Sequence, residues 1–559
     1  MNKKQIYNDT YWSFFLVSFF SNYNIKYVCI SPGARNSSLI NAFTQNKNYF
    51  CISHVDERSS AYYALGIAKQ TKQPVILLST SGTAAANYLP AVIESSLSRH
   101  PLILLTADRP RYLINTGANQ TIKQENLFGS HVRYSTSIGL PKNKTNVLEQ
   151  KLLKSIKYAS GDNKECFPPG PVHLNCPFEE SELKNNNFEK IKFEKFDKKV
   201  IFIKPSIDLI KQTKRTLIIA GPQEVDSHQN YIVELSKKIK APIFADPLSQ
   251  IRYGYNNHNI ITTYDIFLKC IEINPDQILR FGRKPTSKIL CKYLDKWNSK
   301  TIYIDDFSQF NDDSKTFIKN PILEYCQYQI KNINWTNDQI WTKKIIEYES
   351  SIKLMINNYI KKEKVFEGTI ANICVNTLDN NDCLFIGNSM PIRDIDTFTF
   401  SINKKINVFG NRGASGIDGV ISTALGISKG NNNSSNVLLI IGDMSFYHDM
   451  NGLIKSNNNL SIVVINNGGG GIFSFLPMSE SKLENFEKYW IANTSVDFKT
   501  VAKLYNCKYF GVSNKEQLNE AIITSFKTDG IKIIEVKIEI KENVLSHTKL
   551  YNSIKRKLY

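Results

Sequence analysis

Several features that would assign this sequence to a common class of proteins are missing from it. Its ten cysteines form no Cys-x-x-Cys pair and follow no regular spacing. This argues against a zinc or disulfide framework and favours buried thiols in a reducing compartment. No apolar run comes near the roughly 20 residues that a helix needs to span a bilayer.

Basic clusters interleaved with aromatic side chains are also missing. The net charge of +19 comes from lysines spread along the whole chain, so we expect no nucleic-acid binding. The positive charge would instead help to attract polyanionic small molecules.

The first residues imitate a secretory leader without completing one. Two lysines precede the run WSFFLVSFF, but no small-residue cleavage site follows it. Residues 8–10, Asn-Asp-Thr, are of the types that cap helices. We therefore predict an amphipathic helix over residues 10–21, and a protein of the cytoplasm, or of the plastid stroma if an organelle encodes it, with no membrane partner.

Short apolar runs alternate with helical patterns along most of the chain. Polar residues gather where the apolar runs end, as they do at the carboxyl edge of parallel strands. The predicted strands are residues 27–30, 75–78, 102–105, 171–175, 216–220, 242–245, 277–281, 301–304, 383–386, 437–441, 462–465 and 533–538. Because 559 residues are too many for one core, we predict an α/β protein of three doubly wound parallel-sheet domains.

Composition sets the expected domain limits. Residues 185–199 are charged, lack periodicity and are typical of a linker, and residues 337–361 predict a polar helix that leads into the last third. We place the domains at residues 1–184, 200–335 and 350–559. A strand, a polar turn and an arginine occur in both the first and the last third, at Arg35 and Arg393, which predicts two similar sheets.

Residues 437–473 hold the strongest chemical signal. Asp443 follows one apolar run, and Asn467 with a glycine run follows the next. Glycines let the backbone approach a ligand closely. A carboxylate, an amide oxygen and a backbone carbonyl at neighbouring strand ends suit a hard divalent cation such as Mg²⁺, with room for phosphate oxygens. Taken alone, the same residues are compatible with ordinary strand-end turns.

A series of sequence blocks resembles one family of thiamine-diphosphate enzymes. The blocks are SPGARNS, HVDERSS, STSGTAAAN, LTADRP, GANQTIKQ, GPVHLNCPF, GNSMPIRDID, NRGASGIDG, GDMS and NNGGGGIFSFLP. In this order they are similar to the 2-succinyl-5-enolpyruvyl-6-hydroxy-3-cyclohexene-1-carboxylate synthases, transferases of menaquinone and phylloquinone biosynthesis. The resemblance implies a pyrimidine-binding, a central and a diphosphate-binding domain, with active sites formed between two chains of a homodimer or homotetramer.

The resemblance also implies a reaction. It is the decarboxylation of 2-oxoglutarate and the 1,4-addition of the resulting succinyl carbanion to isochorismate, with thiamine diphosphate and Mg²⁺ or Mn²⁺ as cofactors. Glu57 matches the catalytic carboxyl beside the cofactor's aminopyrimidine, and Gln120 matches a catalytic amide between cofactor and substrates. Without the resemblance, Glu57 would be a first-turn glutamate stabilised by the helix dipole.

The binding residues implied by the resemblance are mostly cations and polar side chains in turns. Substrate contacts are implied for Arg35, Arg109, Gln120, Lys288, Asn388, Ser389, Arg393 and Arg412. Cofactor contacts are implied for Glu57, Ser81, Ile417, Gly442, Asp443, Ser445, Asn467, Gly469 and Ile472, and metal contacts for Asp443, Asn467 and Gly469. Two dicarboxylate substrates require several cations, and arginine pairs with carboxylates in a bidentate manner. Any one of these arginines alone would more simply form a surface salt bridge.

Two positions depart from the family pattern. Ala34 replaces a common serine and Ile289 stands where some members carry a second cation, which bears on substrate affinity. Met444 occupies a position that is usually glycine in the diphosphate–metal motif of thiamine-diphosphate enzymes. Two other functions stay open. One is a carboligase of the acetohydroxyacid-synthase type, although pyruvate has a single carboxylate and would not need the arginine set. The other is a basic binding protein on an inactive fold, against which the intact cofactor residues argue.

Overall fold

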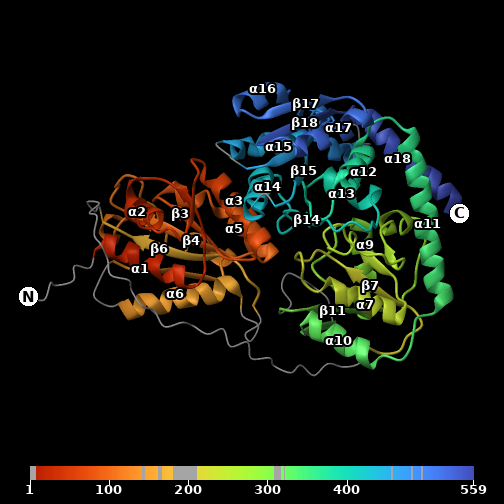
Figure 1. The fold of residues 1–559 in the computed structure, drawn as a ribbon, viewed down its shortest axis with the longest axis horizontal. Helices are drawn as coiled ribbons and strands as arrows, with labels where there is room; N and C mark the ends of the chain where they lie inside the picture. Colours follow the sequence, from red (N-terminus) through yellow and green to blue (C-terminus); the bar gives the residue numbers. More distant parts are fainter. Residues whose placement is uncertain are drawn as a thin grey trace, which may run out of the picture. The chain divides into compact units, whose positions relative to one another are not determined.

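Three six-stranded sheets of parallel strands form the framework of the protein (Figure 1). A computed structural model describes residues 8–140, 145–161, 167–179, 210–307, 316–319, 321–432, 434–454, 458–479, 483–492 and 495–558. The strand orders are β2-β1-β3-β4-β6-β5, β12-β11-β10-β7-β8-β9 and β14-β13-β15-β16-β18-β17. The predicted fold class is confirmed, whereas the predicted linker at residues 185–199 lies outside the described residues.

The described chain groups into two compact units. One takes in residues 1–203, 411–432 and 449–456, and the other takes in residues 204–410, 433–448 and 457–559. The first unit contains the first sheet, and the second unit contains the other two sheets.

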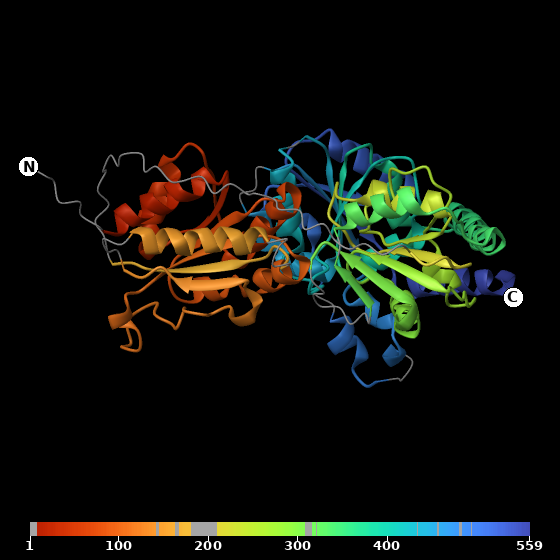
Figure 2. The ribbon, with the colours of Figure 1, turned by 90° about the horizontal axis from the view of Figure 1, so that it is seen from below.

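The first sheet is fully parallel. Its strands are β1 (Tyr27–Ser31), β2 (Phe50–Ser53), β3 (Val75–Ser79), β4 (Leu102–Asp108), β5 (Tyr134–Ser137) and β6 (Val172–Pro177). Its helices are α1 (Asp9–Asn22), α2 (Ser37–Gln45), α3 (Glu57–Thr71), α4 (Thr83–Ala86), α5 (Leu89–Ser98) and α6 (Thr145–Ser160). Figure 2 shows α6, in orange, running along this sheet.

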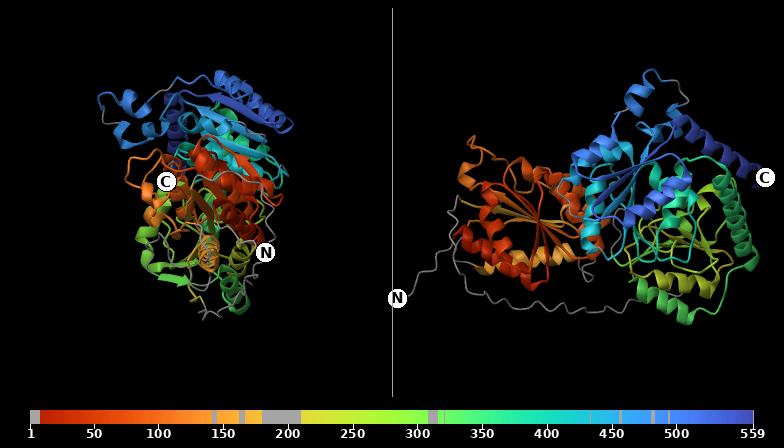
Figure 3. Two further views of the ribbon diagram at one scale, coloured as in Figure 1. Left: turned by 90° about the vertical axis from the view of Figure 1, so that its left-hand side faces the viewer. Right: turned by 45° about the horizontal axis from the view of Figure 1, so that its top comes forward.

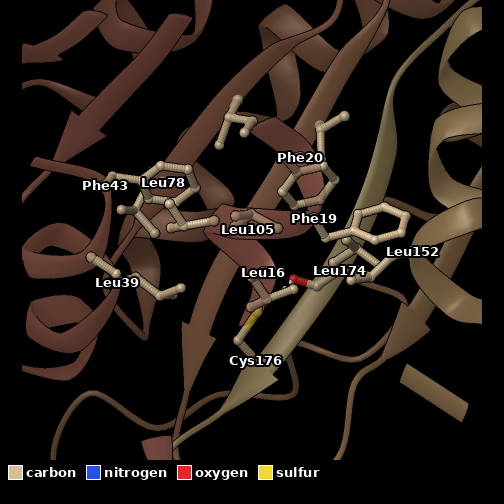
Figure 4. Packing of buried hydrophobic residues seen from close by; sticks show 14 of the residues in the cluster. Leu16, Phe19, Phe20, Leu39, Phe43, Leu78, Leu105, Leu152, Leu174 and Cys176 are labelled. Carbon is tan, nitrogen blue, oxygen red and sulfur yellow. Dashed lines mark hydrogen bonds between the residues drawn. The ribbon is translucent and has the colours of Figure 1, made fainter. Parts of the chain in front are cut away.

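One face of the first sheet packs on α1, α2 and α6. Leu16 and Phe19 of α1 join Leu78, Leu105 and Leu174 of the strands in one buried cluster (Figure 4). The helix predicted at residues 10–21 is present as α1, but its predicted amphipathic character is wrong. Buried side chains lie around most of its circumference, because α2 packs on a second side of it.

Helix α3 covers the other face of the first sheet and packs closely on α14 (Val420–Gly430). A Cβ atom on Gly66 would lie 2.8 Å from the Cα atom of Gly426, and one on Gly426 would lie 2.9 Å from the Cα atom of Gly66. The two helices therefore meet where both lack side chains, which brings the segment before α14 close to the start of α3.

The second sheet is also parallel. Its strands are β7 (Thr216–Ala220), β8 (Ile243–Ala245), β9 (Ile260–Ile261), β10 (Gln277–Phe281), β11 (Thr301–Asp305) and β12 (Thr316–Lys319). Its helices are α7 (Gln229–Ile239), α8 (Tyr264–Phe267), α9 (Lys288–Lys296) and α10 (Ile322–Asn332), followed by the long α11 (Gln339–Lys362). Two separate apolar clusters pack on its two faces.

The third sheet has the same parallel construction (Figure 3). Its strands are β13 (Cys383–Ile386), β14 (Asn407–Phe409), β15 (Val437–Gly442), β16 (Leu460–Asn466), β17 (Lys508–Val512) and β18 (Ile531–Lys537). The remaining helices are α12 (Glu367–Thr377), α13 (Met390–Phe398), α15 (Asp443–Asp449), α16 (Phe498–Leu504), α17 (Lys515–Phe526) and α18 (Ile540–Leu558). Helix α18 lies beside α11, and the Tyr359 hydroxyl donates to the Ser546 carbonyl at 3.0 Å.

A buried arginine joins the second sheet to the third. Nη2 of Arg252 pairs with Oδ1 of Asp396 at 2.6 Å, and both side chains are almost fully buried. The other guanidinium nitrogens donate to the carbonyls of Ala245, Ile395 and Thr399. Removing one member of such a pair leaves an unpaired buried charge and is strongly destabilising. We therefore expect the packing of the second sheet against the third to depend on this contact.

All strands predicted from the sequence are present, but six others were missed. The missed strands are β2, β5, β9, β12, β14 and β17, and each is the outermost strand of its sheet. The nine cysteines in the described residues are free, five of them buried. No described helix combines the length and apolar character needed to cross a membrane.

Candidate active site

The ends of β15 and β16 place Asp443 and Asn467 at one edge of the third sheet, since the two strands are paired in parallel. Asp443 is buried. Its Oδ1 accepts from the Met444 N–H at 2.7 Å, and its Oδ2 accepts from the Gly469 N–H at 2.8 Å. Burial raises the pKa of Asp443 to about 6, and these backbone donors oppose the rise.

The amide of Asn467 is held at its nitrogen end and open at its oxygen end. Nδ2 donates to Oε1 of Glu367 at 3.1 Å. Oδ1 is buried and has no hydrogen-bond partner among the described residues. A buried amide oxygen without a donor is costly unless a ligand satisfies it.

Glycine is required at two positions shortly after Asn467. Gly469 has a φ of 141°, and a Cβ atom there would lie 2.1 Å from the Ile491 carbonyl oxygen. A Cβ atom on Gly471 would lie 2.4 Å from Nδ2 of Asn467. The glycine run predicted to permit close approach therefore does so first within the protein itself.

These residues fit a hard divalent cation. A carboxylate, an unpartnered amide oxygen and a nearby backbone carbonyl form the oxygen-rich donor set that Mg²⁺ or Mn²⁺ prefers. A cavity of about 400 Å³ adjoins them, lined by Asp443, Asn467, Gly468 and Lys537 among others. The lysine at its wall suits an anionic group such as a phosphate.

Three more residues that the resemblance implies for cofactor binding lie near Asp443 and Asn467 in the chain. Gly442 ends β15, Ser445 is buried in α15, and Ile472 is half-buried in the turn after the glycines.

Strand β13, next to β15, ends at a strained turn that carries Asn388 and Ser389. Ser389 adopts φ 71° and ψ −127°, a region that side-chain-bearing residues rarely occupy and that costs of order 1–3 kcal/mol. Asn388 is buried, and Nη1 of Arg393 donates to the Ser389 carbonyl. The turn presents the start of α13, where backbone N–H groups favour an anion.

Behind Asn467 lies a buried cluster that sequence reasoning missed. Glu367, Asp394 and His547 offer ligand atoms within 4.8 Å of one another. Nε2 of His547 lies 2.9 Å from Oδ1 of Asp394, and Nδ1 lies 2.8 Å from the Asn543 carbonyl. Burial, followed by the charge of Asp394, raises the pKa of Glu367 to about 8. Burial alone would lower the pKa of His547, yet the bond and charge of Asp394 raise it.

Glu57 begins α3 in the first unit, after the Asp56 cap. Nδ2 of Asn87 donates to Oε2 of Glu57 at 3.2 Å. The residue is only partly buried within this unit. Asp56 also accepts from Nδ2 of Asn451 at 3.3 Å, which fixes the turn that presents Glu57.

The loop carrying Gln120 is pinned to the carboxyl edge of the first sheet by Gln124. Oε1 of Gln124 accepts from the Gly82 N–H at 2.7 Å, and Nε2 donates to the Ala107 carbonyl and to Oδ1 of Asn175, each at 3.1 Å. Gln120 itself has a positive φ of 52°. The sequence offered a signal for Gln124, which ends the GANQTIKQ block, but only the structure shows that it positions Gln120.

The predicted cations of the first unit lie at the same edge. Arg35 is buried, with Nη1 donating to the Phe178 carbonyl at 3.1 Å. Nε of Arg109 donates to the Asn119 carbonyl at 3.2 Å. Between them Asp108 accepts from Nδ2 of Asn175 at 2.7 Å, and burial raises its pKa to about 6. Ser81, predicted to contact the cofactor, is buried, and its hydroxyl has no partner in the described residues.

The segment before α14 carries the last predicted residues of the first unit. Ile417 is 39% exposed, unusual for isoleucine, and its neighbour Asp418 accepts from the Tyr62 hydroxyl. A Cβ atom on Gly419 would overlap the Tyr62 ring. Arg412 belongs to this unit as well.

Lys288 is the predicted substrate contact that belongs to the second sheet. It begins α9 of the second sheet, is exposed, and follows the capping residue Ser287. Ile289, one of the departures from the family pattern, packs against the apolar cluster there. The neighbouring Arg283 pairs with Glu224 at 3.0 Å.

Comparison with protein families matches each part of the chain to a thiamine-dependent domain. Residues 13–127 match "Thiamine pyrophosphate enzyme, N-terminal TPP binding domain", residues 192–386 match "Middle domain of thiamine pyrophosphate", and residues 395–536 match "Thiamine pyrophosphate enzyme, C-terminal TPP binding domain". Among solved structures, a benzoylformate decarboxylase from Polynucleobacter necessarius has the same fold, with a TM-score of 0.67 at 14% identity over 95% of this chain and 99% of that one.

Curated relatives extend over nearly the whole chain. The 2-succinyl-5-enolpyruvyl-6-hydroxy-3-cyclohexene-1-carboxylate synthase of Bacillus cytotoxicus is 36% identical over 94% of both chains. The synthases of that name from Listeria monocytogenes and Lysinibacillus sphaericus are 37% and 34% identical over 95% and 99% of both chains. The chain therefore belongs to the family of 2-succinyl-5-enolpyruvyl-6-hydroxy-3-cyclohexene-1-carboxylate synthases, which are thiamine-diphosphate enzymes.

Proposed function

We propose that the protein decarboxylates 2-oxoglutarate and adds the resulting succinyl carbanion to isochorismate in a 1,4-addition, within menaquinone or phylloquinone synthesis. One structural observation gives this proposal its main support. Buried Asp443 and the unpartnered Oδ1 of Asn467 lie at adjoining strand ends, beside a cavity of about 400 Å³ that the diphosphate would occupy. Family membership supports the substrates.

Asp443, Asn467 and the Gly469 carbonyl would hold Mg²⁺ or Mn²⁺, and the cation would bind the diphosphate. Gly442, Ser445 and Ile472 would line the same site. When bound, thiamine diphosphate supplies a nucleophilic carbon and accepts the electron pair left by CO₂. The protein's own task at this end is to fix the diphosphate so that the reacting part of the cofactor is held in one place.

At the other end of the cofactor we assign the proton chemistry to Glu57. Its carboxyl would hydrogen-bond to a ring nitrogen of the aminopyrimidine and so favour the imino tautomer, in which that ring nitrogen carries the proton given up by the exocyclic amino group. Ile417 would support the bent cofactor, Ser81 would contact it, and Gln120 would lie between cofactor and substrates. Exclusion of water from this region would protect the reaction from a competing protonation.

Substrate recognition is assigned to cations and polar groups at both sheet edges. Both substrates are dicarboxylates, and arginine is the side chain best suited to pair with them. The residues assigned are Arg35, Arg109, Gln120, Lys288, Asn388, Ser389, Arg393 and Arg412. The uncapped start of α13 beside Ser389 adds backbone N–H groups for one carboxylate.

We also propose the organisation implied by family resemblance. The pyrimidine-binding, central and diphosphate-binding domains would span residues 1–184, 200–335 and 350–559. The protein would act as a homodimer or homotetramer in the cytoplasm or plastid stroma, with active sites formed between two chains. Sedimentation with and without cofactor tests the oligomeric state.

Release of CO₂ tests the reaction. Purified protein with Mg²⁺, thiamine diphosphate and 2-oxoglutarate should release CO₂ at a rate that depends on isochorismate, and should consume isochorismate in equal amount. Equal CO₂ release without isochorismate would contradict the acceptor assignment. Faster turnover of pyruvate than of 2-oxoglutarate would favour the acetohydroxyacid-synthase type of activity instead.

A further inference from the structure

We propose that Glu367 is a positioning residue that orients the Asn467 amide toward the catalytic cation. This inference rests on the proposed function, because it concerns the cation site assigned above. Glu367 begins α12, far from Asn467 in sequence, and belongs to none of the family blocks recognised in the sequence. The structure places its carboxylate against the amide nitrogen of Asn467 at 3.1 Å.

The orientation of an asparagine amide decides whether it can bind a cation. Its oxygen is a ligand, whereas its NH₂ group repels a cation. The acceptor at Oε1 of Glu367 fixes the NH₂ end, so the oxygen must point the other way. Oδ1 of Asn467 is buried and has no partner among the described residues, as expected for an atom reserved for a ligand.

Packing holds the amide in that orientation from a second side. The Cα atom of Gly471 lies against it, since a Cβ atom there would come within 2.4 Å of Nδ2 and 3.4 Å of Oδ1. The amide therefore has a hydrogen-bond acceptor at one end and the backbone of a glycine packed beside it.

Glu367 is itself held by α18. Its backbone N–H donates to Oδ1 of Asn543 at 3.1 Å. His547, on the same helix, bonds to Asp394 and lies within the cluster that includes Glu367. Rings of Phe366, Phe398 and Phe475 pack around the imidazole with centroid distances of 5.1–5.3 Å.

This cluster could be mistaken for a second metal site. Nε2 of His547 and Oδ1 of Asp394 face each other at 2.9 Å, a hydrogen-bond distance, so these two groups satisfy one another. We therefore assign the cluster to support of Glu367. Partners that orient a metal ligand typically change metal affinity by about 10–100-fold when they are removed.

Two variants of similar size separate the positioning role from simple packing. Glu367→Met removes the acceptor, whereas Glu367→Gln keeps an amide oxygen that accepts from Asn467 and adds an NH₂ group that can donate to the unpartnered Oδ2 of Asp394. We expect Glu367→Met to raise the Mg²⁺ concentration for half-maximal thiamine-diphosphate binding about 10–100-fold, and Glu367→Gln to stay close to wild type. Calorimetric titration of thiamine diphosphate at stepped Mg²⁺ concentrations measures both, with the exposed Glu347→Ala as control.

A double-variant cycle shows whether Glu367 acts through Asn467. In an Asn467→Ala background, Glu367→Met should cause no further loss of Mg²⁺ affinity. Glu367→Ala repeats the comparison if the Met variant does not fold, as judged by its melting temperature. Additive losses, or equal binding by the Met and Gln variants, would overturn the inference and leave the proposed function intact. Failure of the wild-type protein to bind thiamine diphosphate at any Mg²⁺ concentration would instead overturn both.

Discussion

The proposed functional carboxyls at the edges of the third and first sheets differ in burial and in hydrogen bonding. Asp443 is buried, receives two backbone N–H donors and faces an amide of fixed orientation. Glu57 is partly exposed, and its carboxyl accepts a hydrogen bond from Nδ2 of Asn87 at 3.2 Å. The proposed cation site therefore has its donor atoms in place in the protein alone, whereas the proposed catalytic carboxyl is still partly exposed.

This difference indicates that cofactor binding and proton transfer depend on different sheet edges. A site that must hold a diphosphate gains affinity from pre-organised donors, because little ordering is left to do on binding. A carboxyl that must pass a proton needs an environment that changes between the free and the loaded protein. Substitutions at the two edges should therefore affect different quantities.

The largest expected effect is on cofactor binding at the third sheet. Asp443→Ala removes the one carboxylate of the cation site, so we expect no saturable binding of thiamine diphosphate at millimolar Mg²⁺. The fold should persist, because the raised pKa of Asp443 shows that burial of its charged form is unfavourable, and the substitution removes that charge. Calorimetric titration measures the binding, and Asp379→Ala, at an exposed residue, is the matched control. Saturable binding by the Asp443 variant would remove this residue from the cation site.

The next effect separates chemistry from binding at the first sheet. Glu57→Gln keeps the size of the side chain and removes its acid–base function, so turnover should fall about 100-fold or more while cofactor affinity is retained. Steady-state rates and titration calorimetry give the two quantities, with Glu125→Gln, at a residue paired with Arg111, as control. A rate within about tenfold of wild type, equivalent to roughly 1.4 kcal/mol, would show that the role assigned to Glu57 is wrong.

The smallest effect concerns the pH dependence of stability at the first sheet. Burial raises the pKa of Asp108 from 3.8 to about 6, so the folded state binds this proton more tightly than the unfolded state. The resulting stabilisation is complete below pH 3.8 and is lost as the pH rises through about 6. Asp108→Asn cannot titrate.

Melting temperatures measured from pH 4 to pH 7 test this prediction. The wild-type protein should lose more stability over that range than the Asp108→Asn variant does, whatever the offset between them. Curves that run parallel would mean that the pKa of Asp108 is close to its ordinary value in the folded protein. Asp379→Asn, at an exposed residue, should leave the pH dependence unchanged.

The sequence predicted the inner strands of each sheet and missed the outer ones for one physical reason. Inner strands such as β3 and β15 are buried on both faces and are continuous apolar runs. The outer β2 is exposed or half-buried along its length, and β9 has two residues. An edge strand needs few apolar residues, so periodicity does not distinguish it from a loop.

A similar division applies to the candidate site. Asp443, Asn467 and the glycines follow apolar runs directly, so their place at a sheet edge could be predicted. Glu367 meets Asn467, and His547 meets Asp394, only through contacts distant in sequence, and neither Glu367 nor His547 lies in a recognisable motif. Gln124 falls between these cases, because its block is recognisable but its bonds to two other strands are visible only in the fold.

Helix α18 is the last described element to leave the ribosome, and it carries Asn543 and His547. A nascent chain that ends before residue 540 already contains Asp443 and Asn467, but it lacks the residues that hold Glu367 against the amide. Tight capture of the coenzyme should therefore wait until translation has delivered this helix.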